Sequence, residues 1–263
     1  MTTTRTYPGR TIKAGETDAA MVRAVQARLK ALAYTVPAES GVFGPETVAA
    51  VKLFQAQHVD RLGQPLKADG KVGPHTWAAL FGDHAVPETT RPSSPFFAAL
   101  LEKARSQLHV REVPVNSNSG PEVDRYLSRV GVSLTLPAKS KPWCCAFVYW
   151  CFDEVATAHG LANPMVRTAG CLDHWNRAVS RGATRVVGSR AAADPALIVP
   201  GMVFVMDYGA GKGHTGFVQG VEGGFIHTIE GNTDASRTRE GGGVYELRRK
   251  LSAINKGYIA YPL

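Results

Sequence analysis

A cysteine at the start of an apolar helix is the residue of this chain best suited to nucleophilic chemistry. Cys144 opens a run in which positions 144, 147, 148, 151 and 155 repeat with the period of one buried helix face. The free N–H groups and the dipole at a helix start favour a thiolate, so we expect a lowered pKa for Cys144. A thiol that cleaves an amide also needs a base to take its proton and a group that orients this base.

Two predicted strands further along the chain supply candidates for the base and its orienting group. His214 lies between glycines at the start of one strand, where small neighbours leave its imidazole open to a substrate. Glu230 and Asn232 end the next strand two residues apart, so alternation predicts that both lie on one side. We expect His214 to be the general base, Glu230 to orient it, and Asn232 to be an auxiliary or oxyanion-side donor.

Other residues compete for these roles. His227 lies mid-strand between apolar residues, a position more typical of a core histidine than of a base. Cys145 directly follows Cys144 and leaves open which thiol reacts. Four cysteines without a CxxC pair do not indicate a structural zinc site, and the one disulfide to consider joins Cys151 to Cys171. A zinc amidase built from His214, His227 and a cysteine is an alternative, but its spacing fits no known zinc pattern. We therefore expect no metal and no cofactor.

An internal repeat organises the first part of the chain. Residues 41–51 (GVFGPETVAAV) match residues 70–80 (GKVGPHTWAAL) at an offset of 29. In each copy a proline follows a glycine, which suits the first helical position because no N–H is needed there. With an amphipathic helix over 17–33, the repeat predicts a small three-helix domain over residues 1–83. The proline-rich stretch that follows, 84–95, reads as a linker.

The second part, residues 96–263, changes its period along the chain. Apolar residues first recur at helical spacing, and after residue 195 they alternate as in strands. Helices followed by an antiparallel sheet form an α+β domain. The expected strands are 201–207, 214–221, 224–230, 243–249 and 257–261.

Charge and hydropathy narrow the possible partners. Residues 1–90 carry a net charge of +2 (10 basic, 8 acidic) and residues 91–263 carry +6 (20 basic, 14 acidic). Such a surface attracts anionic polymers, but no dense basic run or recognition motif indicates nucleic acid, and residues 248–250 read as a solvated strand end. The sequence contains no run of about 18 apolar residues, so we expect no stable membrane insertion. The N-terminus lacks the apolar core of a signal peptide.

The first part of the chain resembles the peptidoglycan-binding-like module of three helices. The resemblance covers about residues 15–82 and rests on Val22-x-x-x-Gln26-x-x-Leu29, on SGVFGPET at 40–47 and on AVKLFQ at 50–55. It implies that this domain binds the cell wall. A helical spacer or a protein-docking module is the alternative.

The second part resembles the CHAP family of cysteine/histidine-dependent amidohydrolases and peptidases over about residues 97–262. The motifs are WCCAFV at 143–148, GHTGFV at 213–218 and EGN at 230–232. This resemblance implies a papain-like fold, the nucleophile at Cys144 rather than at Cys145, where relatives commonly have alanine, and a substrate contact by Trp143. The sequence departs from the family at Met202, where an aspartate is common.

Together the two resemblances imply a monomeric peptidoglycan hydrolase that cuts amide bonds of the wall peptide, either as an N-acetylmuramoyl-L-alanine amidase or as an endopeptidase. We expect synthesis in the cytoplasm without a signal peptide and action on the wall after release or injection. A phage endolysin fits this route, and an effector of a contractile secretion machine is the alternative. A non-catalytic wall-binding protein is a further alternative from another functional class.

Overall fold

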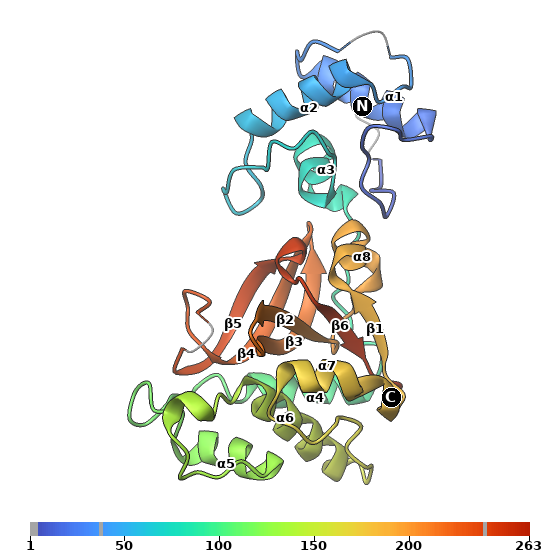
Figure 1. Ribbon diagram of the computed structural model, residues 1–263. Helices are drawn as coiled ribbons and strands as arrows, with labels where there is room; N and C mark the ends of the chain where they lie inside the picture. The colour runs from blue at the N-terminus through green and yellow to red at the C-terminus, as the bar shows by residue number, and fades with distance from the viewer. Residues whose placement is uncertain (1–4, 37–38, 239–240) are drawn as a thin grey trace. The chain divides into compact units, whose positions relative to one another are not determined.

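The computed structural model describes residues 5–36, 39–238 and 241–263. The chain forms two compact units, one made mainly of residues up to Glu88 and the other mainly of residues from Thr89. Helices make up the first unit, and helices followed by a sheet make up the second (Figure 1). This is the helix-then-sheet order of the α+β class that the sequence predicts.

Three helices build the first unit. Their bounds are Ala19–Ala31 (α1), Pro45–Gln57 (α2) and Pro74–Phe81 (α3). The carboxylate of Asp18 caps the start of α1, while α2 and α3 each begin with the proline of the repeat. Val25, Phe54 and Trp77 come from the three helices and are fully buried in one core. The repeat therefore folds as two similar turn–helix starts around shared apolar side chains.

Two buried glutamines hold the repeated turns in the same shape. Three bonds of Gln26 are 3.0 Å long, to the Val42 carbonyl, to Thr47 Oγ1 and from the Gly41 N–H, and a longer bond of 3.4 Å reaches Ser40 Oγ. Gln55 makes the same three bonds 29 residues later. Its partners are the Lys71 carbonyl (2.8 Å), Thr76 Oγ1 (3.1 Å) and the Gly70 N–H (2.9 Å). Each glutamine thus fastens the turn that precedes the next helix.

The range predicted for the linker, 84–95, includes residues that belong to the folded units. Ala85 and Val86 are buried in the core of the first unit. Thr89 exchanges two backbone hydrogen bonds with Val221 of the second unit, at 3.0 and 2.8 Å. Local composition marks this stretch as proline-rich and polar, but it does not reveal that two small apolar side chains join a core or that the backbone pairs with a distant strand.

The second unit places its main helices before a six-stranded sheet of order β1-β6-β2-β3-β4-β5. The helices are Pro95–Arg105 (α4), Pro121–Val130 (α5), Cys144–Ala158 (α6), Cys171–Arg177 (α7) and the short Gly188–Ala193 (α8). The strands are Thr184–Val187 (β1), Val203–Gly209 (β2), Lys212–Glu222 (β3), Phe225–Thr233 (β4), Gly243–Lys250 (β5) and Gly257–Ala260 (β6). The sequence predicts five of the six strands. It misses β1, which has four mostly exposed residues and no alternation to detect.

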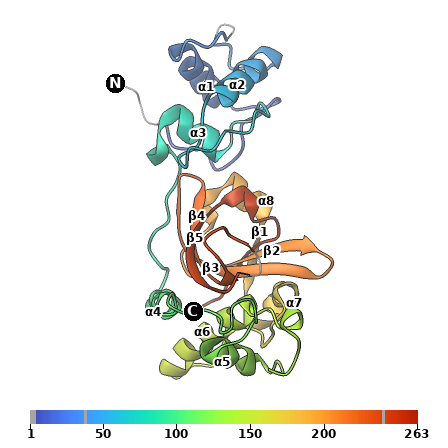
Figure 2. The ribbon, with the colours of Figure 1, turned by 90° about the vertical axis from the view of Figure 1, so that its left-hand side faces the viewer.

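Helix α6 lies against the sheet, and α4, α5 and α7 gather on the same side (Figures 1 and 2). Phe147 and Phe152 of α6 contact Phe217 of β3, with ring centroids 6.1 and 5.8 Å apart. Strand β4 approaches the start of α6 closely because position 231 is a glycine. A Cβ on Gly231 would lie 2.7 Å from the Trp143 ring and 3.0 Å from Phe147. The sheet can therefore bring polar side chains to the helix start.

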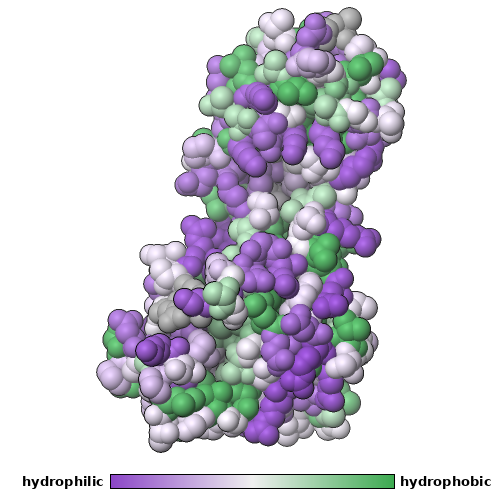
Figure 3. All heavy atoms as spheres, viewed as in Figure 1, coloured by the Kyte–Doolittle hydropathy of each residue, from purple (hydrophilic) through white to green (hydrophobic). Residues whose placement is uncertain are grey.

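Among the described residues, no helix is long and apolar enough to cross a membrane. Helix α6 is buried along most of its length, but it has 15 residues and uses its apolar side chains inside the second unit. On the face drawn in Figure 3, hydrophilic residues predominate and hydrophobic residues form small groups. Most large apolar side chains of the described residues thus lie in the cores of the two units.

Candidate active site

Cys144 is the first residue of α6, as the sequence predicts, and its side chain is only 3% exposed. The residue before it, Trp143, is completely buried. Its indole N–H donates to Glu112 Oε1 at 2.8 Å, and its ring packs against Tyr126. The expected substrate contact of Trp143 is therefore not supported, because the ring has no exposed surface. Trp143 instead fixes the start of α6, with Glu112 as a partner that the sequence does not reveal.

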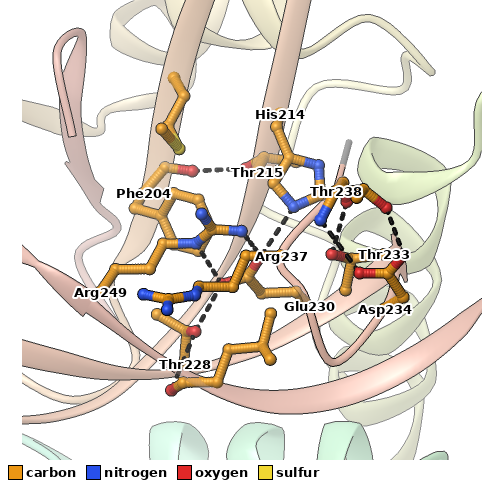
Figure 4. Close-up of polar contacts among 12 residues, drawn as sticks. Phe204, His214, Thr215, Thr228, Glu230, Thr233, Asp234, Arg237, Thr238 and Arg249 are labelled. Carbon is orange, nitrogen blue, oxygen red and sulfur yellow. Dashed lines mark hydrogen bonds and ion pairs between the residues drawn. The ribbon is translucent and has the colours of Figure 1, made fainter. Parts of the chain in front are cut away.

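His214 and Glu230 form a buried pair across two strands of the sheet. His214 lies on β3 and Glu230 on β4, and both side chains are fully buried. His214 Nε2 lies 2.7 Å from Glu230 Oε2 (Figure 4). A carboxylate can only accept, so Nε2 carries the proton and donates it to this bond. Nδ1 is then the ring nitrogen left for the nucleophile, and it has no other hydrogen-bond partner within the described residues.

Arg249 of β5 holds the carboxylate of Glu230 with two bonds. Its Nε donates to Oε1 at 2.7 Å and its Nη2 donates to Oε2 at 2.6 Å, while Thr228 Oγ1 donates to Oε1 at 2.5 Å (Figure 4). The expectation that residues 248–250 are a solvated strand end is wrong for Arg249, which is buried. The alternation of side chains in β5 could have predicted this burial, because Arg249 must face opposite to its two basic neighbours.

Asn232 is buried two residues after Glu230 on the same strand, but its side chain does not share the hydrogen bonds that hold Glu230. Neither its amide nitrogen nor its amide oxygen has a hydrogen-bond partner among the described residues. The register between β4 and β5 shifts between Glu230 and Thr233, and Asn232 has a φ of 58°. The simple alternation that predicts a shared side for Glu230 and Asn232 is therefore interrupted here.

The two adjacent cysteines face different neighbours. Cys144 Sγ lies 3.4 Å from Cys171 Sγ, and the Cys144 thiol interacts with His214. Cys145 interacts electrostatically with Tyr261, whose pKa is raised mainly by burial and further by Cys145. The structure thus brings Cys144 to the base, and one residue along a helix is enough to turn Cys145 away from it. None of the four cysteines is in a disulfide, so Cys151 and Cys171 are not joined as was considered.

Burial and charge act in opposite directions on the histidine–glutamate pair. Burial would raise the pKa of Glu230, but hydrogen bonds from Arg249 and His214 lower it to about 2. Burial would likewise lower the pKa of His214, but its contacts with Cys144 and Glu230 raise that pKa to about 9. The site therefore stabilises the imidazolium that forms when His214 takes the proton of Cys144.

The pKa of the Cys144 thiol is raised well above its ordinary value, which is opposite to the expected direction. The hydrogen bond with Cys171 is the main cause and burial adds to it, whereas His214 acts to lower this pKa. A helix start does favour a thiolate, but here the neighbouring sulfur and the loss of water outweigh it. Formation of the thiolate consequently depends on proton transfer to His214.

Two alternatives, His227 as the base and a site for a metal ion, have less support from the geometry than His214 has. His227 also lies on β4 but is partly exposed, and the bond to Glu230 is made by His214. No group of three or more His, Cys, Asp or Glu side chains suited to a metal ion occurs within residues 5–36, 39–238 and 241–263.

Comparisons with known proteins add independent information on both units. Residues 18–80 match the family model of a peptidoglycan binding domain, and residues 137–232 match that of the CHAP domain. A curated relative, an uncharacterized protein in the bpoA1 3′ region of Kitasatospora aureofaciens, is 44% identical over 72 residues. These are 27% of this chain and 54% of the relative, so the chain spans about half the length of that protein. No solved structure gives a significant match.

The part of the second unit that matches the CHAP domain, a family with a papain-like fold, lies within the α+β unit and contains Cys144, His214, Glu230 and Asn232. Arg249 lies outside the matched segment, although it contacts Glu230 directly. The chain as a whole combines this domain with an N-terminal domain of the peptidoglycan-binding type. That is the two-domain architecture that the sequence motifs predict.

Proposed function

We propose that the protein is a peptidoglycan hydrolase that cleaves amide bonds of the wall peptide, as an N-acetylmuramoyl-L-alanine amidase or as an endopeptidase. The observation that carries the proposal is the connected set of Cys144, His214 and Glu230 inside the segment that matches the CHAP domain. These are the nucleophile, base and orienting group that thiol-dependent amide hydrolysis needs. The match of the first unit to a peptidoglycan binding domain supports the substrate class.

The geometry supports a two-stage mechanism. His214 takes the proton of Cys144, and the resulting thiolate attacks the carbonyl carbon of the substrate. The imidazolium then returns the proton to the leaving amine, which departs and leaves a thioester on Cys144. Water attacks this thioester while His214 removes its proton, and the acid product leaves the regenerated thiol. Glu230 holds the tautomer and stabilises the imidazolium through its bond to Nε2.

Two donors are candidates for stabilising the oxyanion that forms during each attack. The backbone N–H of Cys144 is at the first position of α6 and has no intrahelical partner. The buried amide of Asn232 has no partner among the described residues. Losing one donor of this kind costs roughly 10²–10³ in rate. Because Cys144 is nearly enclosed, substrate binding must displace some of the side chains around it.

The decisive experiment compares the two adjacent cysteines on purified peptidoglycan. Cys144→Ala should reduce the loss of turbidity by about 10⁴-fold or more, because the nucleophile and base act as one unit. Cys145→Ala is the matched control, since it makes the same change in the same helix turn and should keep most activity. An active Cys144→Ala protein would overturn the proposal. Mass spectrometry of the released fragments then identifies the bond that is cut.

Inhibitors separate this chemistry from the alternatives of other classes. Iodoacetamide should inactivate the protein and EDTA should not, whereas a zinc amidase would show the reverse. Purified protein that binds walls but never reduces their turbidity would instead be a wall-binding or adaptor protein. We further propose the cell wall as its place of action, and neighbouring genes would distinguish a phage lysis enzyme from an effector of a contractile secretion machine.

A further inference from the structure

The proposed nucleophile has a second thiol within hydrogen-bond distance. Cys171 Sγ lies 3.4 Å from Cys144 Sγ, and both side chains are buried. The proposed mechanism of amide hydrolysis does not use Cys171. Its hydrogen bond even opposes formation of the Cys144 thiolate. A pair of thiols this close, one of them at a reactive position, is the arrangement of a nucleophilic cysteine and its resolving partner.

The fold builds this pair from two helix starts and a glycine. Cys144 is the first residue of α6 and Cys171 is the first residue of α7. Strand β3 leaves space for Cys171 because the residue before His214 is Gly213. A Cβ on Gly213 would lie 3.1 Å from the Cys171 Cβ and 2.9 Å from the Met206 carbonyl oxygen. The same glycine–histidine step therefore places both the base and the second thiol near Cys144.

The other two cysteines are not placed to replace Cys171. Cys145 is turned by about 100° from Cys144 on the same helix, and it interacts electrostatically with Tyr261. Cys151 follows Cys144 by seven residues on the same helix, about 10 Å along the axis. A disulfide needs sulfurs about 2.05 Å apart, so Cys144 and Cys171 have to approach by only about 1.4 Å. Small rotations of two side chains can supply such a shift.

We infer that Cys144 and Cys171 form a site of reversible oxidation, at which hydrogen peroxide converts the nucleophile into a disulfide and stops hydrolysis. Cys144 sulfur attacks one peroxide oxygen, the O–O bond breaks, and a sulfenic acid and water form. The Cys171 sulfur then attacks the sulfenic sulfur, the S–O bond breaks, and the departing hydroxide leaves as water with the Cys171 proton. The two thiols lose two electrons in total, and the peroxide is reduced to two waters. A dithiol reductant reverses the step by exchange.

The test treats the whole chain with hydrogen peroxide and then with dithiothreitol, and follows two readouts. Peptide mapping under denaturing, thiol-blocked conditions should find a disulfide between Cys144 and Cys171 and two free thiols of the original four. Turbidity assays should show that peroxide removes activity and that dithiothreitol restores most of it. Each protein is compared with its own untreated rate, so changes in basal activity do not enter the result.

Cys171→Ala and Cys151→Ala form the matched pair of variants, since each leaves three cysteines. Peroxide should inactivate Cys171→Ala without recovery, because a sulfenic acid without a resolving thiol proceeds to sulfinic acid. Cys151→Ala should recover as the wild type does. Equal recovery in both variants, or a disulfide that maps to other cysteines, would overturn the inference. The activity readout rests on the proposed function, whereas the mapping does not. A mapped Cys144–Cys171 disulfide in a protein that still hydrolyses walls would confirm the oxidation site and refute Cys144 as the nucleophile.

Discussion

At the scale of single residues, the site is a chain of charged and polar groups that runs from Arg249 through Glu230 and His214 to Cys144. Each link alters the proton affinity of the next. Arg249 keeps Glu230 ionised, Glu230 favours the protonated His214, and His214 acts to lower the pKa of Cys144. Phe204 packs near both His214 and Arg249, with a ring centroid 6.0 Å from the imidazole. The charges are thus held in low-dielectric surroundings where each contact has a large effect.

Arg249→Gln should shift the acid limb of the pH profile of kcat/KM toward higher pH. Without the guanidinium, burial raises the pKa of Glu230, and a protonated Glu230 can no longer accept the bond from His214. A lost opposite charge of this kind shifts a pKa by about 1–3 units, so the limb should move by a similar amount. Arg249→Lys should restore part of the shift.

The matched control for this prediction is Arg248→Gln, which removes the same charge from the adjacent, half-buried position on the other side of β5. Its pH profile should overlay that of the wild type. An unchanged acid limb in Arg249→Gln, with only a uniform loss of rate, would mean that Arg249 supports the fold and does not set the ionisation of Glu230.

The same two groups predict how stability depends on pH. The pKa of His214 is raised from 6.5 to about 9, so its contribution is complete below pH 6.5 and is lost as the pH rises through 9. The pKa of Glu230 is lowered from 4.5 to about 2, so its contribution is complete above pH 4.5 and is lost as the pH falls through 2. Both act fully between pH 4.5 and 6.5, where the melting temperature should be highest.

Melting temperatures of the wild type, His214→Ala and His227→Ala between pH 3 and 10 check this expectation. The decline above pH 6.5 should be weaker in His214→Ala. It should persist in His227→Ala, which removes the other histidine discussed for this site. A decline of equal size in all three proteins would assign it to other groups.

At the scale of secondary structure, the elements that depend on local patterns are predictable and the contacts between them are not. Apolar periodicity predicts the helix that begins at Cys144 and the five longer strands of the sheet. The clamp on Glu230 depends on the neighbouring strand β5, whose Arg249 is 19 residues away. The thiol pair depends on where α7 meets α6. Sequence spacing within one element contains no information about either contact.

The glutamines of the first unit give an intermediate case, because their spacing is visible in the sequence but their bonds are not. Gln55→Ala would leave the Gly70 N–H, the Lys71 carbonyl and the Thr76 hydroxyl without this partner. A buried group that loses its bond costs about 1–3 kcal/mol, so we expect a loss of roughly 2–4 kcal/mol in the local stability of α2 and α3. Hydrogen exchange over residues 45–81 measures it.

Gln57→Ala is the appropriate control for this change, since it removes the same side chain from the same helix at an exposed position. The local stability derived from its hydrogen exchange should stay within about 0.5 kcal/mol of that of the wild type. If Gln55→Ala were equally mild, water would be satisfying the turn, and the repeated glutamine would not be what holds it.

At the scale of the whole molecule, the residues of the proposed chemistry and the match to a peptidoglycan binding domain lie in different units. Every residue of the proposed site belongs to the second unit, together with the core that surrounds α6. The first unit has its own buried core and a net charge of about +2, against +6 for residues 91–263. We therefore expect the second unit to keep its chemistry without the first, and to lose mainly its attachment to an insoluble substrate.

A fragment of residues 89–263, which retains the Thr89–Val221 pairing, tests this division. It should cut small soluble wall peptides nearly as fast as the full chain. On insoluble walls it should be slower by roughly tenfold or more, because tethering raises the effective concentration of the catalytic domain near its substrate. Some attraction to anionic walls should survive at low salt through its charge of +6 and fade as salt rises. The binding control is sedimentation of full-length Cys144→Ala with purified walls, beside the same variant of the fragment. Equal sedimentation of both, with equal digestion by their active forms, would show that the first unit is a spacer or docks to another partner.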